Sequence, residues 1–381
     1  MALIHGWVGA ISGVFIFLVA VTGIGLAFFG ELTELQLGDM VRAPDGPHAD
    51  IGKILRSAED GYAGEFEPLG LFMPDTRIEG LETTLVYGIA PDAETGTMMI
   101  SIDPTTAAYK GSFELHHLFA HEFNDFHFTL LMGRPAQIVI ALIGFLMVLF
   151  TLSGLYLWWP RHGNVRGKAL KVQRGGKLKA LLFNWHGLAG IWLGLFAVYF
   201  ALTGTALSVP NWYGPVLAGM NDPPEWDQRF RTACDGEVTP SEAGRMALAA
   251  FPGREITSFG FVRGDMEKYI LQLRGPGDIN VRFGDAMAHV HATCPDQMWT
   301  TTLDEQPLPV WLGSQMLSLH GAHIFGRFSE LVNVITGLAL AFLSVSGIYV
   351  FLKRTLPAAQ SRKTKKTRRR ASSSTRTLEP L

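Results

Sequence analysis

The chain has 381 residues, of which 48% are apolar, and its formal net charge is −2. These averages fit a two-domain soluble protein or a small membrane protein, and they exclude a strongly basic nucleic-acid-binding chain. The distribution of apolar residues separates the two classes, because residues 7–29, 135–159, 187–209 and 331–352 contain no Asp, Glu, Lys or Arg.

Each of the four apolar runs is long enough to cross the ~30 Å hydrocarbon core of a bilayer. Buried helices of a soluble protein would be shorter and would carry a polar stripe. The first run could also be a cleaved signal peptide, but it lacks a basic start and a small-x-small cleavage site. We therefore expect four retained transmembrane helices.

The charges flanking these runs predict their orientation. Residues 160–185 hold seven Lys or Arg and no acid, and residues 353–381 hold ten bases and one acid. The two long loops are acidic, with sixteen acids against five bases in residues 31–114 and fourteen against eight in residues 211–311. Because excess Lys and Arg stay in the cytoplasm, both termini and the short loop are predicted inside, and both long loops outside. The basic Ser/Thr-rich tail is expected to be disordered and near anionic lipid, with no nucleic acid as partner.

The two halves of the chain align as a repeat. His5-Gly6-Trp7-Val8-Gly9 matches His186-Gly187-Leu188-Ala189-Gly190, and Thr22-Gly23 matches Thr203-Gly204. With a slightly larger offset, His127 falls on His320, Arg134 on Arg327, and Ser153-Gly154-Leu155-Tyr156 on Ser346-Gly347-Ile348-Tyr349. Each half then reads helix, outer domain, helix, and the halves are parallel repeats about an axis along the membrane normal.

The predicted fold class is membrane α-helical: four transmembrane helices as two parallel helix–domain–helix repeats. Each outer loop is expected to fold as an α+β unit, with helices over 51–62 and 240–251 and strands over 83–89, 98–102 and 269–273. The predicted boundaries are helix 1 over 1–29, outer domain 1 over 30–115, an outer segment with helix 2 over 116–159, a basic loop over 160–185, helix 3 over 186–209, outer domain 2 over 210–311, an outer segment with helix 4 over 312–352, and the basic tail over 353–381.

Four of the twelve histidines are repeat-matched, and all four lie at helix ends. His5 and His186 open the first helix of each half, whereas His127 and His320 lie at the opposite membrane face. The symmetry therefore predicts an imidazole pair near each face, and such pairs are suitable axial ligands for haem iron. No Cys-x-x-Cys-His motif is present in the sequence, so the haem would be bound without a covalent link.

The roles of several glycines and of further histidines can be interpreted in more than one way. Gly6, Gly9 and Gly13 share one helix face that Gly187, Gly190 and Gly194 repeat, which suits either a trough for a flat macrocycle or close helix packing. His117 and His121 are i, i+4 neighbours that could hold an exterior metal or a third haem. Arg134 and Arg327 could contact haem propionates or lipid headgroups. The two cysteines, Cys234 and Cys294, are a disulfide candidate because the loop is expected to face oxidising conditions.

Several motifs together resemble the PepSY-associated transmembrane family. They are His-Gly-x-x-Gly at a helix start, Phe251-Pro252-Gly253, Ile102-Asp103-Pro104 and the stretch from Ser153 to Arg161. The resemblance covers nearly the whole chain except the basic tail. It implies PepSY-like periplasmic domains, a bacterial inner (plasma) membrane location and haem ligation by His5, His186, His127 and His320. His323 stands where the first half has Leu130, so His320 and His323 compete as the ligand.

Members of that family include inner-membrane ferric-siderophore reductases with b-type haem. The leading hypothesis is an oxidoreductase with two b haems that passes electrons from a cytoplasmic donor, such as a flavoprotein, to a periplasmic ferric siderophore for iron release and uptake. The sequence has no nucleotide-binding Gly-rich fingerprint, so the donor's cofactor is expected on another protein. Two alternatives remain: a haem-free membrane-anchored PepSY regulatory or binding module, and a siderophore or metal transporter. No catalytic residue is assigned.

Overall fold

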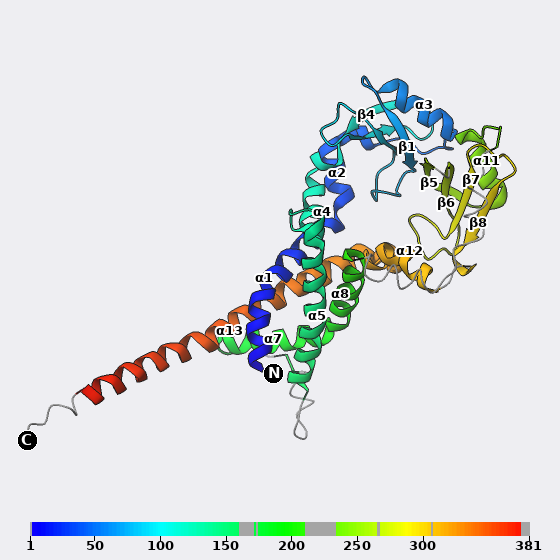
Figure 1. The fold of residues 1–381 in the computed structure, drawn as a ribbon. Coiled ribbons are helices and arrows are strands. Elements are labelled where there is room, and N and C mark those ends of the chain that lie inside the picture. The colour runs from blue at the N-terminus through cyan, green and yellow to red at the C-terminus, as the bar shows by residue number, and fades with distance from the viewer. Residues whose placement is uncertain are drawn as a thin grey trace, which may run out of the picture. The chain divides into compact units, whose positions relative to one another are not determined.

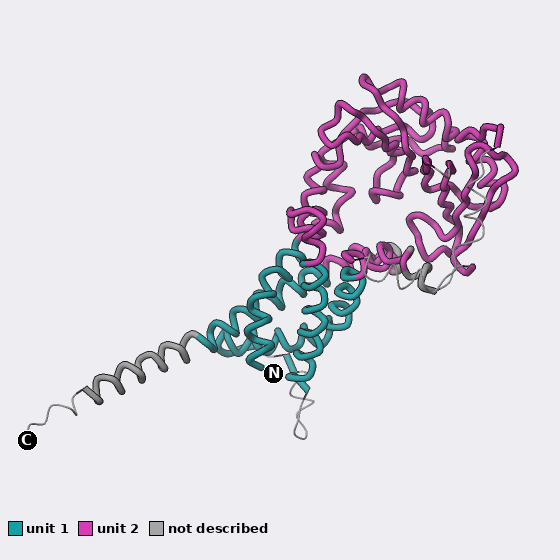
Figure 2. The backbone as a smooth tube through the Cα atoms, in the orientation of Figure 1, with its two compact units in different colours: residues 1–21, 139–205, 335–381 teal, residues 22–138, 206–334 magenta. Residues whose placement is uncertain are grey.

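The computed structural model describes residues 2–159, 171–172, 174–209, 234–264, 267–305 and 308–374. The chain divides into two compact units (Figure 2). The helical unit comprises residues 1–21, 139–205 and 335–381, and the sheet unit comprises residues 22–138 and 206–334. Residues 160–170 and 173 of the predicted basic loop lie outside the described residues.

Helices long and apolar enough to cross a membrane confirm that the chain is a membrane protein. In the described part of the chain three helices pass this test by themselves: α1 (Ala2–Ala27), α5 (Gln137–Trp158) and α13 (Ser329–Ser374, apolar up to Thr355) (Figure 1). A fourth candidate is a broken pair, α7 (Leu178–Trp192) and α8 (Gly194–Ser208), which bend by 61° at Leu193. These four segments overlap the four predicted runs.

The bend between α7 and α8 corrects the prediction of one straight run over 187–209. Leu193 caps α7 with φ −107° and ψ −2°, and Gly194 follows it. Glycine is among the weakest helix formers, so it lowers the cost of interrupting the helix. Gly13 occupies the equivalent position of α1, which runs unbroken from Ala2 to Ala27. The glycine therefore permits the bend and is not sufficient to cause it.

The basic tail also differs from its prediction. It was expected to be disordered from residue 353, but α13 continues to Ser374. Ala, Gln, Lys and Arg make up most of this stretch, and all four have high helix propensity. Local propensity therefore extends the helix even though Pro357 lies within it.

The sheet unit is built around one eight-stranded sheet with the order β4-β3-β2-β1-β5-β6-β7-β8 (Figure 1). All neighbouring strands are antiparallel. The strands are β1 (Glu67–Phe72), β2 (Thr84–Ile89), β3 (Thr97–Ile102), β4 (Tyr109–Phe113), β5 (Glu255–Val262), β6 (Lys268–Arg274), β7 (Ala286–His291) and β8 (Met298–Thr302). The predicted strands correspond to β2, β3 and β6.

Both outer loops therefore contribute a helix and strands, as predicted, with four strands in each, but they are not separate domains. The first strands of the two loops pair with each other, with Leu71 opposite Phe259 and Phe72 opposite Ser258. Both Leu71 and Phe259 are buried. The edge strand of one half thus covers the edge strand of the other, which leaves fewer unpaired backbone groups than two four-stranded sheets would have.

Two helices pack on the sheet and share its main core. α3 (Ile51–Gly61) begins at Asp50, whose carboxylate accepts the N–H groups of Gly52 and Lys53. α11 (Pro240–Ala250) begins with a capping box between Thr239 and Glu242. Caps of this type satisfy the free N–H groups of a first helical turn. The core beneath the two helices is formed by aliphatic side chains from both halves, among them Ile54, Leu71, Ile100, Ala247, Leu271 and Val290.

Short helices connect the sheet to the spanning helices. They are α2 (Phe29–Leu37), η1 (Gly38–Val41), η2 (Leu115–His117), α4 (Phe119–Thr129), η3 (Arg134–Ala136), η4 (Leu303–Glu305), α12 (Leu308–His320) and η5 (His323–Phe328). A second apolar cluster, which includes Val41, Leu85 and Leu118, anchors the connections from the first half. The predicted histidines of the sheet unit lie on these connections.

Candidate functional site

His5 in α1 is held by a serine of another helix of the helical unit. Its Nδ1 lies 2.8 Å from Oγ of Ser153 in α5. The Ser153 hydroxyl donates its own proton to the carbonyl oxygen of Phe150 at 3.1 Å. When the Ser153 hydroxyl donates to Phe150, its oxygen accepts from His5, and in that arrangement Nδ1 carries the hydrogen and Nε2 keeps the lone pair. Neutral imidazole in this form is a metal ligand through Nε2.

The second half repeats this arrangement at His186. Its Nδ1 lies 2.9 Å from Oγ of Ser346 in α13, and that hydroxyl donates to the carbonyl oxygen of Leu343 at 3.3 Å. The tautomer argument is the same, so Nε2 of His186 is again the nitrogen with the lone pair. His5 and His186 are close enough to interact electrostatically.

A glycine follows each of these serines and lies against the imidazole. A Cβ placed on Gly154 would lie 3.4 Å from Cε1 of His5, and one on Gly347 would lie 3.0 Å from Cε1 of His186. An added methyl group at Gly347 would crowd the ring of His186, whereas one at Gly154 would be in van der Waals contact with the ring of His5. The repeated Ser-Gly pair therefore supplies both the hydrogen-bond acceptor and the space for one histidine.

The glycines of the two stripes, in α1 and in the α7–α8 pair, do not all have the same surroundings. Some suit close helix packing, and others suit a trough for a flat macrocycle. A Cβ on Gly6 would lie 2.9 Å from Phe351, and one on Gly194 would lie 3.0 Å from Thr151, which favours close helix packing at these two sites. A Cβ on Gly9 or Gly190 would meet nothing nearer than 4.0 Å and 3.9 Å. These two repeat-matched glycines lie one helical turn after His5 and His186, where a flat ligand would lie against the helix.

The outer pair lies in the sheet unit, and the structure brings its two rings close together. The ring centroids of His127 in α4 and His320 at the end of α12 are 6.1 Å apart, with an interplanar angle of 48°. A metal–imidazole bond is about 2 Å long and the ring centre lies about 1 Å behind the nitrogen, so two imidazoles across one metal have centroids about 6 Å apart. The spacing of His127 and His320 fits such an axial pair.

His127 also has a hydroxyl and a glycine beside it. Oγ1 of Thr22 lies 3.3 Å from Nδ1 of His127, and a Cβ on Gly23 would lie 3.1 Å from its Cε1. This Thr-Gly pair therefore contacts His127 as the Ser-Gly pairs contact His5 and His186. The three histidines share one local environment, although they come from different helices.

His323 does not share the geometry of His320. It is buried in η5, and its ring lies against Gly321, where a Cβ would be 2.7 Å from Nε2. Burial, with the nearby charge of Arg282, lowers the pKa of His323 to about 4, so this imidazole is neutral at pH 7. The ring that faces His127 belongs to His320, which favours His320 over His323 as the outer ligand.

The positions of Arg134 and Arg327 do not distinguish a contact with haem propionates from a contact with lipid headgroups. Arg134 is exposed at the start of η3. Arg327 has its backbone in η5, and its side chain lies outside the described part of the structure. The choice between haem propionates and lipid headgroups stays a prediction.

His117 and His121 do not share a helix face, contrary to the prediction. His117 ends η2, Leu118 is extended with φ −77° and ψ 129°, and α4 begins at Phe119. The break occurs where Leu118 buries its side chain in the second apolar cluster. His121 instead lies 3.4 Å from Asp125 on its own helix, whereas His117 lies with His116 and Glu94. Sequence spacing missed the role of Glu94, because it is 23 residues from His117.

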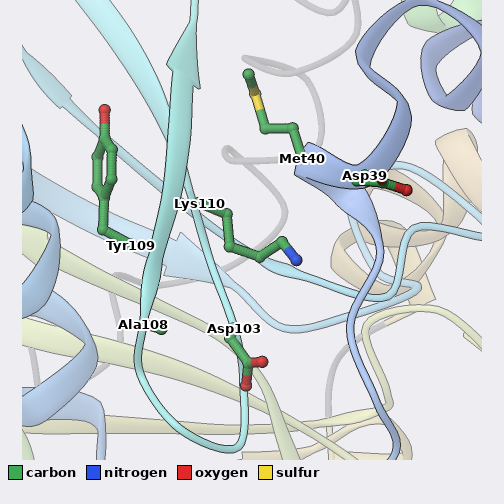
Figure 3. Close-up of a pocket in the computed structure, with 6 residues that line it drawn as sticks. All are labelled: Asp39, Met40, Asp103, Ala108, Tyr109 and Lys110. Carbon is green, nitrogen blue, oxygen red and sulfur yellow. The ribbon is translucent and has the colours of Figure 1, made fainter.

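A surface pocket of about 430 Å³ lies elsewhere in the sheet unit (Figure 3). It is lined by Asp39, Met40, Asp103, Ala108, Tyr109 and Lys110. The Asp103 carboxylate accepts the N–H groups of Thr105 and Thr106, and these bonds help keep its pKa below the usual range. Asp103 thus holds the predicted Ile102-Asp103-Pro104 turn, and none of the predicted site histidines lines this pocket.

Cys234 and Cys294 form a disulfide in the structure, with their Cα atoms 5.1 Å apart. Cys294 is buried, and the bond attaches residue 234 to the segment that follows β7. The cysteines therefore have a structural position and lie outside the histidine sites.

Sequence reasoning selected the histidines but not the residues that position them. Ser153, Ser346 and Thr22 entered the prediction only as matched positions of the repeat. Their common feature, a hydroxyl residue directly before glycine in a spanning helix, was visible as Thr22-Gly23, Ser153-Gly154 and Ser346-Gly347. The signal was present, but which histidine each pair contacts depends on the packing of helices far apart in the chain.

Comparison with known proteins agrees with this membrane organisation. The chain is 30% identical over 121 residues to a Pseudomonas aeruginosa protein described as uncharacterized protein PA4219. The match covers 32% of this chain and 29% of that relative, so it spans under a third of the relative's length. The model of the PepSY-associated TM region matches residues 2–354. The chain therefore belongs to the PepSY-associated transmembrane family.

Proposed function

We propose that this protein is a haem-containing reductase of the bacterial inner membrane. It would bind one b-type haem through His5 and His186 and a second through His127 and His320. Electrons would pass from a cytoplasmic donor to a ferric siderophore on the periplasmic side. The observation that carries the proposal is the recurring environment of a histidine whose Nδ1 faces a hydroxyl and whose ring lies against glycine.

The chain's own residues would prepare the ligands before the cofactor enters. Ser153 and Ser346 hold His5 and His186 as neutral imidazoles with Nε2 available, so no proton has to leave when a metal binds. Orienting partners of this kind also raise the basicity of a ligating imidazole. Haem would supply a centre that accepts and releases one electron at a time.

The positions of the glycines are a second argument for haem binding, independent of the hydrogen bonds between the serines and the histidines. Gly9 and Gly190 leave space on the helix face one turn after His5 and His186. At the other pair, the 6.1 Å spacing of His127 and His320 is the spacing expected for one shared metal. The spacing supports a shared metal at His127 and His320, and the glycines support a flat ligand beside His5 and His186.

The electron donor and the acceptor are inferred from charge and from the family. Residues 160–185 are basic, so an acidic partner such as a flavoprotein would be attracted to that loop. Ferric-siderophore reductases occur in this family, and the sheet unit is the candidate for binding the chelate. Reduction to ferrous iron weakens binding by hard oxygen ligands, which provides a physical reason for iron release.

Absorption spectra of the purified full-length protein test the proposal. The wild type, produced with ample haem, is expected to show a bis-imidazole b-type spectrum and about two haems per chain. His5→Ala or His186→Ala should remove one haem, and His127→Ala or His320→Ala should remove the other. His48→Ala, an exposed histidine of the sheet unit, is the matched control, and His323→Ala should also retain both haems.

The outcomes also separate the rival functions. A colourless protein, despite full haem supply, would overturn the proposal and leave the haem-free PepSY module. Accumulation of ferric siderophore in vesicles without any reductant would indicate a transporter. If the protein holds haem, oxidation of its dithionite-reduced form by a ferric siderophore tests the acceptor. Oxidation by a quinone or a copper complex alone would reassign it.

A further inference from the structure

A second cluster of metal-binding side chains lies in the sheet unit, apart from the histidine pairs. Glu94 is in the turn between β2 and β3, and His116 and His117 form η2 after β4. Oε2 of Glu94 lies 3.4 Å from Nε2 of His116 and 3.2 Å from Nε2 of His117. The two imidazole centroids are 4.0 Å apart. Three donor atoms from two segments therefore meet at one point.

The spacing of these donors suits a shared metal ion as well as it suits ion pairs of the two histidines with Glu94. Metal–nitrogen and metal–oxygen bonds of about 2.1 Å place adjacent ligands about 3.0–3.4 Å apart in octahedral or tetrahedral geometry. Both distances to Glu94 are in this range. In addition, Nε2 of His116 is buried and makes no hydrogen bond in the described part of the chain. A buried ring nitrogen without a hydrogen bond is uncommon, and a cation at this point would satisfy it.

Glu114 supports both halves of the cluster. Its carboxylate accepts the N–H groups of Glu94 and Thr95 and the hydroxyl of Thr95, each at 3.0 Å. Another contact places its Oε2 3.6 Å from Nδ1 of His116. One nearly buried carboxylate thus fixes the turn that carries Glu94 and also faces the far nitrogen of a ligand histidine. At 3.6 Å this second contact is longer than a hydrogen bond, so Glu114 lies where a small shift would form the carboxylate–histidine pair that often supports a metal ligand.

Gln36 in α2 holds the backbone of His117, the third residue of the cluster. Its amide nitrogen donates to the carbonyl oxygen of His117 at 2.8 Å, and its amide oxygen accepts the N–H of Phe119 at 2.8 Å. The side chain thereby bridges the break between η2 and α4. The backbone of His117 is held in place while its imidazole, 58% exposed, faces outward.

We propose that Glu94, His116 and His117 bind one divalent first-row transition-metal ion. Two imidazoles with one carboxylate suit Zn²⁺, Fe²⁺ or Cu²⁺, whereas Mg²⁺ and Ca²⁺ prefer oxygen ligands. The side chains of Glu94 and His117 are 73% and 58% exposed, so the remaining coordination positions face solvent and can take water or an external ligand. The site contains none of the four proposed haem ligands, and its existence does not depend on the proposed function.

Zinc binding by the purified full-length protein tests the proposal. Equilibrium dialysis followed by metal analysis is expected to find one Zn²⁺ per chain that excess Mg²⁺ does not displace. His117→Ala and Glu94→Gln should each weaken this binding at least tenfold. Both side chains are largely exposed, so neither change leaves a cavity in the core. The matched controls are His48→Ala and Glu65→Gln, which alter exposed residues outside the cluster.

A further variant separates the supporting role of Glu114 from direct ligation. Glu114→Gln should weaken Zn²⁺ binding about 10–100-fold while one Zn²⁺ still binds at saturation. Three results would overturn the proposal: equal Zn²⁺ affinity in the wild type and His117→Ala, displacement of Zn²⁺ by Mg²⁺, or loss of Zn²⁺ in His127→Ala but not in His117→Ala. The last result would assign the zinc to the outer histidine pair.

Discussion

At the scale of single residues, the hydroxyl–glycine pairs give each histidine a defined chemical state. A neutral imidazole can carry its proton on either nitrogen, and only one tautomer presents Nε2 to a metal. Ser153 and Ser346 favour that tautomer when their own protons are donated to backbone carbonyl oxygens, which lie 3.1 Å and 3.3 Å away. Thr22 is placed in the same way beside His127.

Removal of one serine hydroxyl tests its positioning role. Ser153→Ala should weaken haem retention about 10–100-fold, the usual cost of losing an orienting partner of a metal ligand. Ser346→Ala should act in the same way on the second ligand, and Ser153→Thr should restore retention. The measurement is the rate of haem transfer to an excess of a haem-scavenging apoprotein.

The control for the serine experiment is Ser12→Ala. The Ser12 hydroxyl in α1 donates to the carbonyl oxygen of Val8 at 2.7 Å, so this change also removes a helix-internal hydroxyl. Haem retention should be unchanged in Ser12→Ala. Normal retention in Ser153→Ala would show that Ser153 does not position His5.

Glycine substitutions distinguish a cofactor trough from helix packing. Gly9→Ala and Gly190→Ala add a methyl group whose nearest neighbours are 4.0 Å and 3.9 Å away. Within a helix, alanine is more favourable than glycine by about 0.5–1 kcal/mol, so thermal stability should stay equal or rise. The haem-to-protein ratio should fall, because the methyl group occupies the space proposed for the macrocycle.

The comparison for these variants is Gly6→Ala. There the new methyl group would lie 2.9 Å from Phe351, so the melting temperature should fall whether or not haem is bound. An unchanged haem ratio in Gly9→Ala and Gly190→Ala would assign the whole glycine stripe to helix packing.

At the scale of elements, the sheet shows how one pairing turns two loops into one folding unit. β1 and β5 are edge strands within their own halves, and their pairing buries Leu71 and Phe259 in a shared core. α3 and α11 add to this joint, because the Ser241 hydroxyl donates to the Asp50 carboxylate that caps α3. Neither half presents a complete hydrophobic core alone.

Truncation of Leu71 tests this coupling. Leu71→Ala removes a fully buried side chain and should lower the free energy of unfolding of the sheet by about 2–5 kcal/mol. Hydrogen exchange should accelerate in β5–β8 as well as in β1–β4. Leu35→Ala, at a side chain that is 83% exposed, should change neither stability nor exchange. Acceleration confined to β1–β4 would show that the two halves unfold independently.

At the scale of the whole molecule, charge distribution and apolar runs predict how the chain enters the membrane. Bases concentrate in residues 160–185 and 353–381, and acids in the segments that form the sheet unit. Since retained Lys and Arg mark the cytoplasmic side, the sheet should face the periplasm. Orientation is therefore a prediction of composition and has a direct test.

Cysteine labelling checks this orientation. The two native cysteines are joined in a disulfide, so a new cysteine is the only free thiol among the described residues. Glu65→Cys should react with a membrane-impermeant maleimide in intact spheroplasts. Arg354→Cys should react only after the membrane is permeabilised. Labelling of Arg354→Cys in intact spheroplasts would reverse the topology and would place His5 and His186 on the outer side.

The sequence by itself determined the spanning segments, the strands β2, β3 and β6, and the candidate histidines. These features depend on local composition and on a repeat that can be read along the chain, so they need no tertiary information. The same local signals did not predict the interruption of the helix at Leu193. Gly194 permits the bend there, but Gly13 at the equivalent position of α1 does not produce one.

Only the tertiary structure decided which residues meet. Ser153 is 148 positions from His5, and Ser346 is 160 positions from His186, so no local pattern could pair them. Likewise, Glu94 joins His116 and His117 because β2, β3 and β4 are neighbouring strands, and Leu71 faces Phe259 because two edge strands pair. Contacts of this kind follow from minimising exposed apolar surface and unpaired backbone over the whole chain, which is a property of the fold and not of any segment.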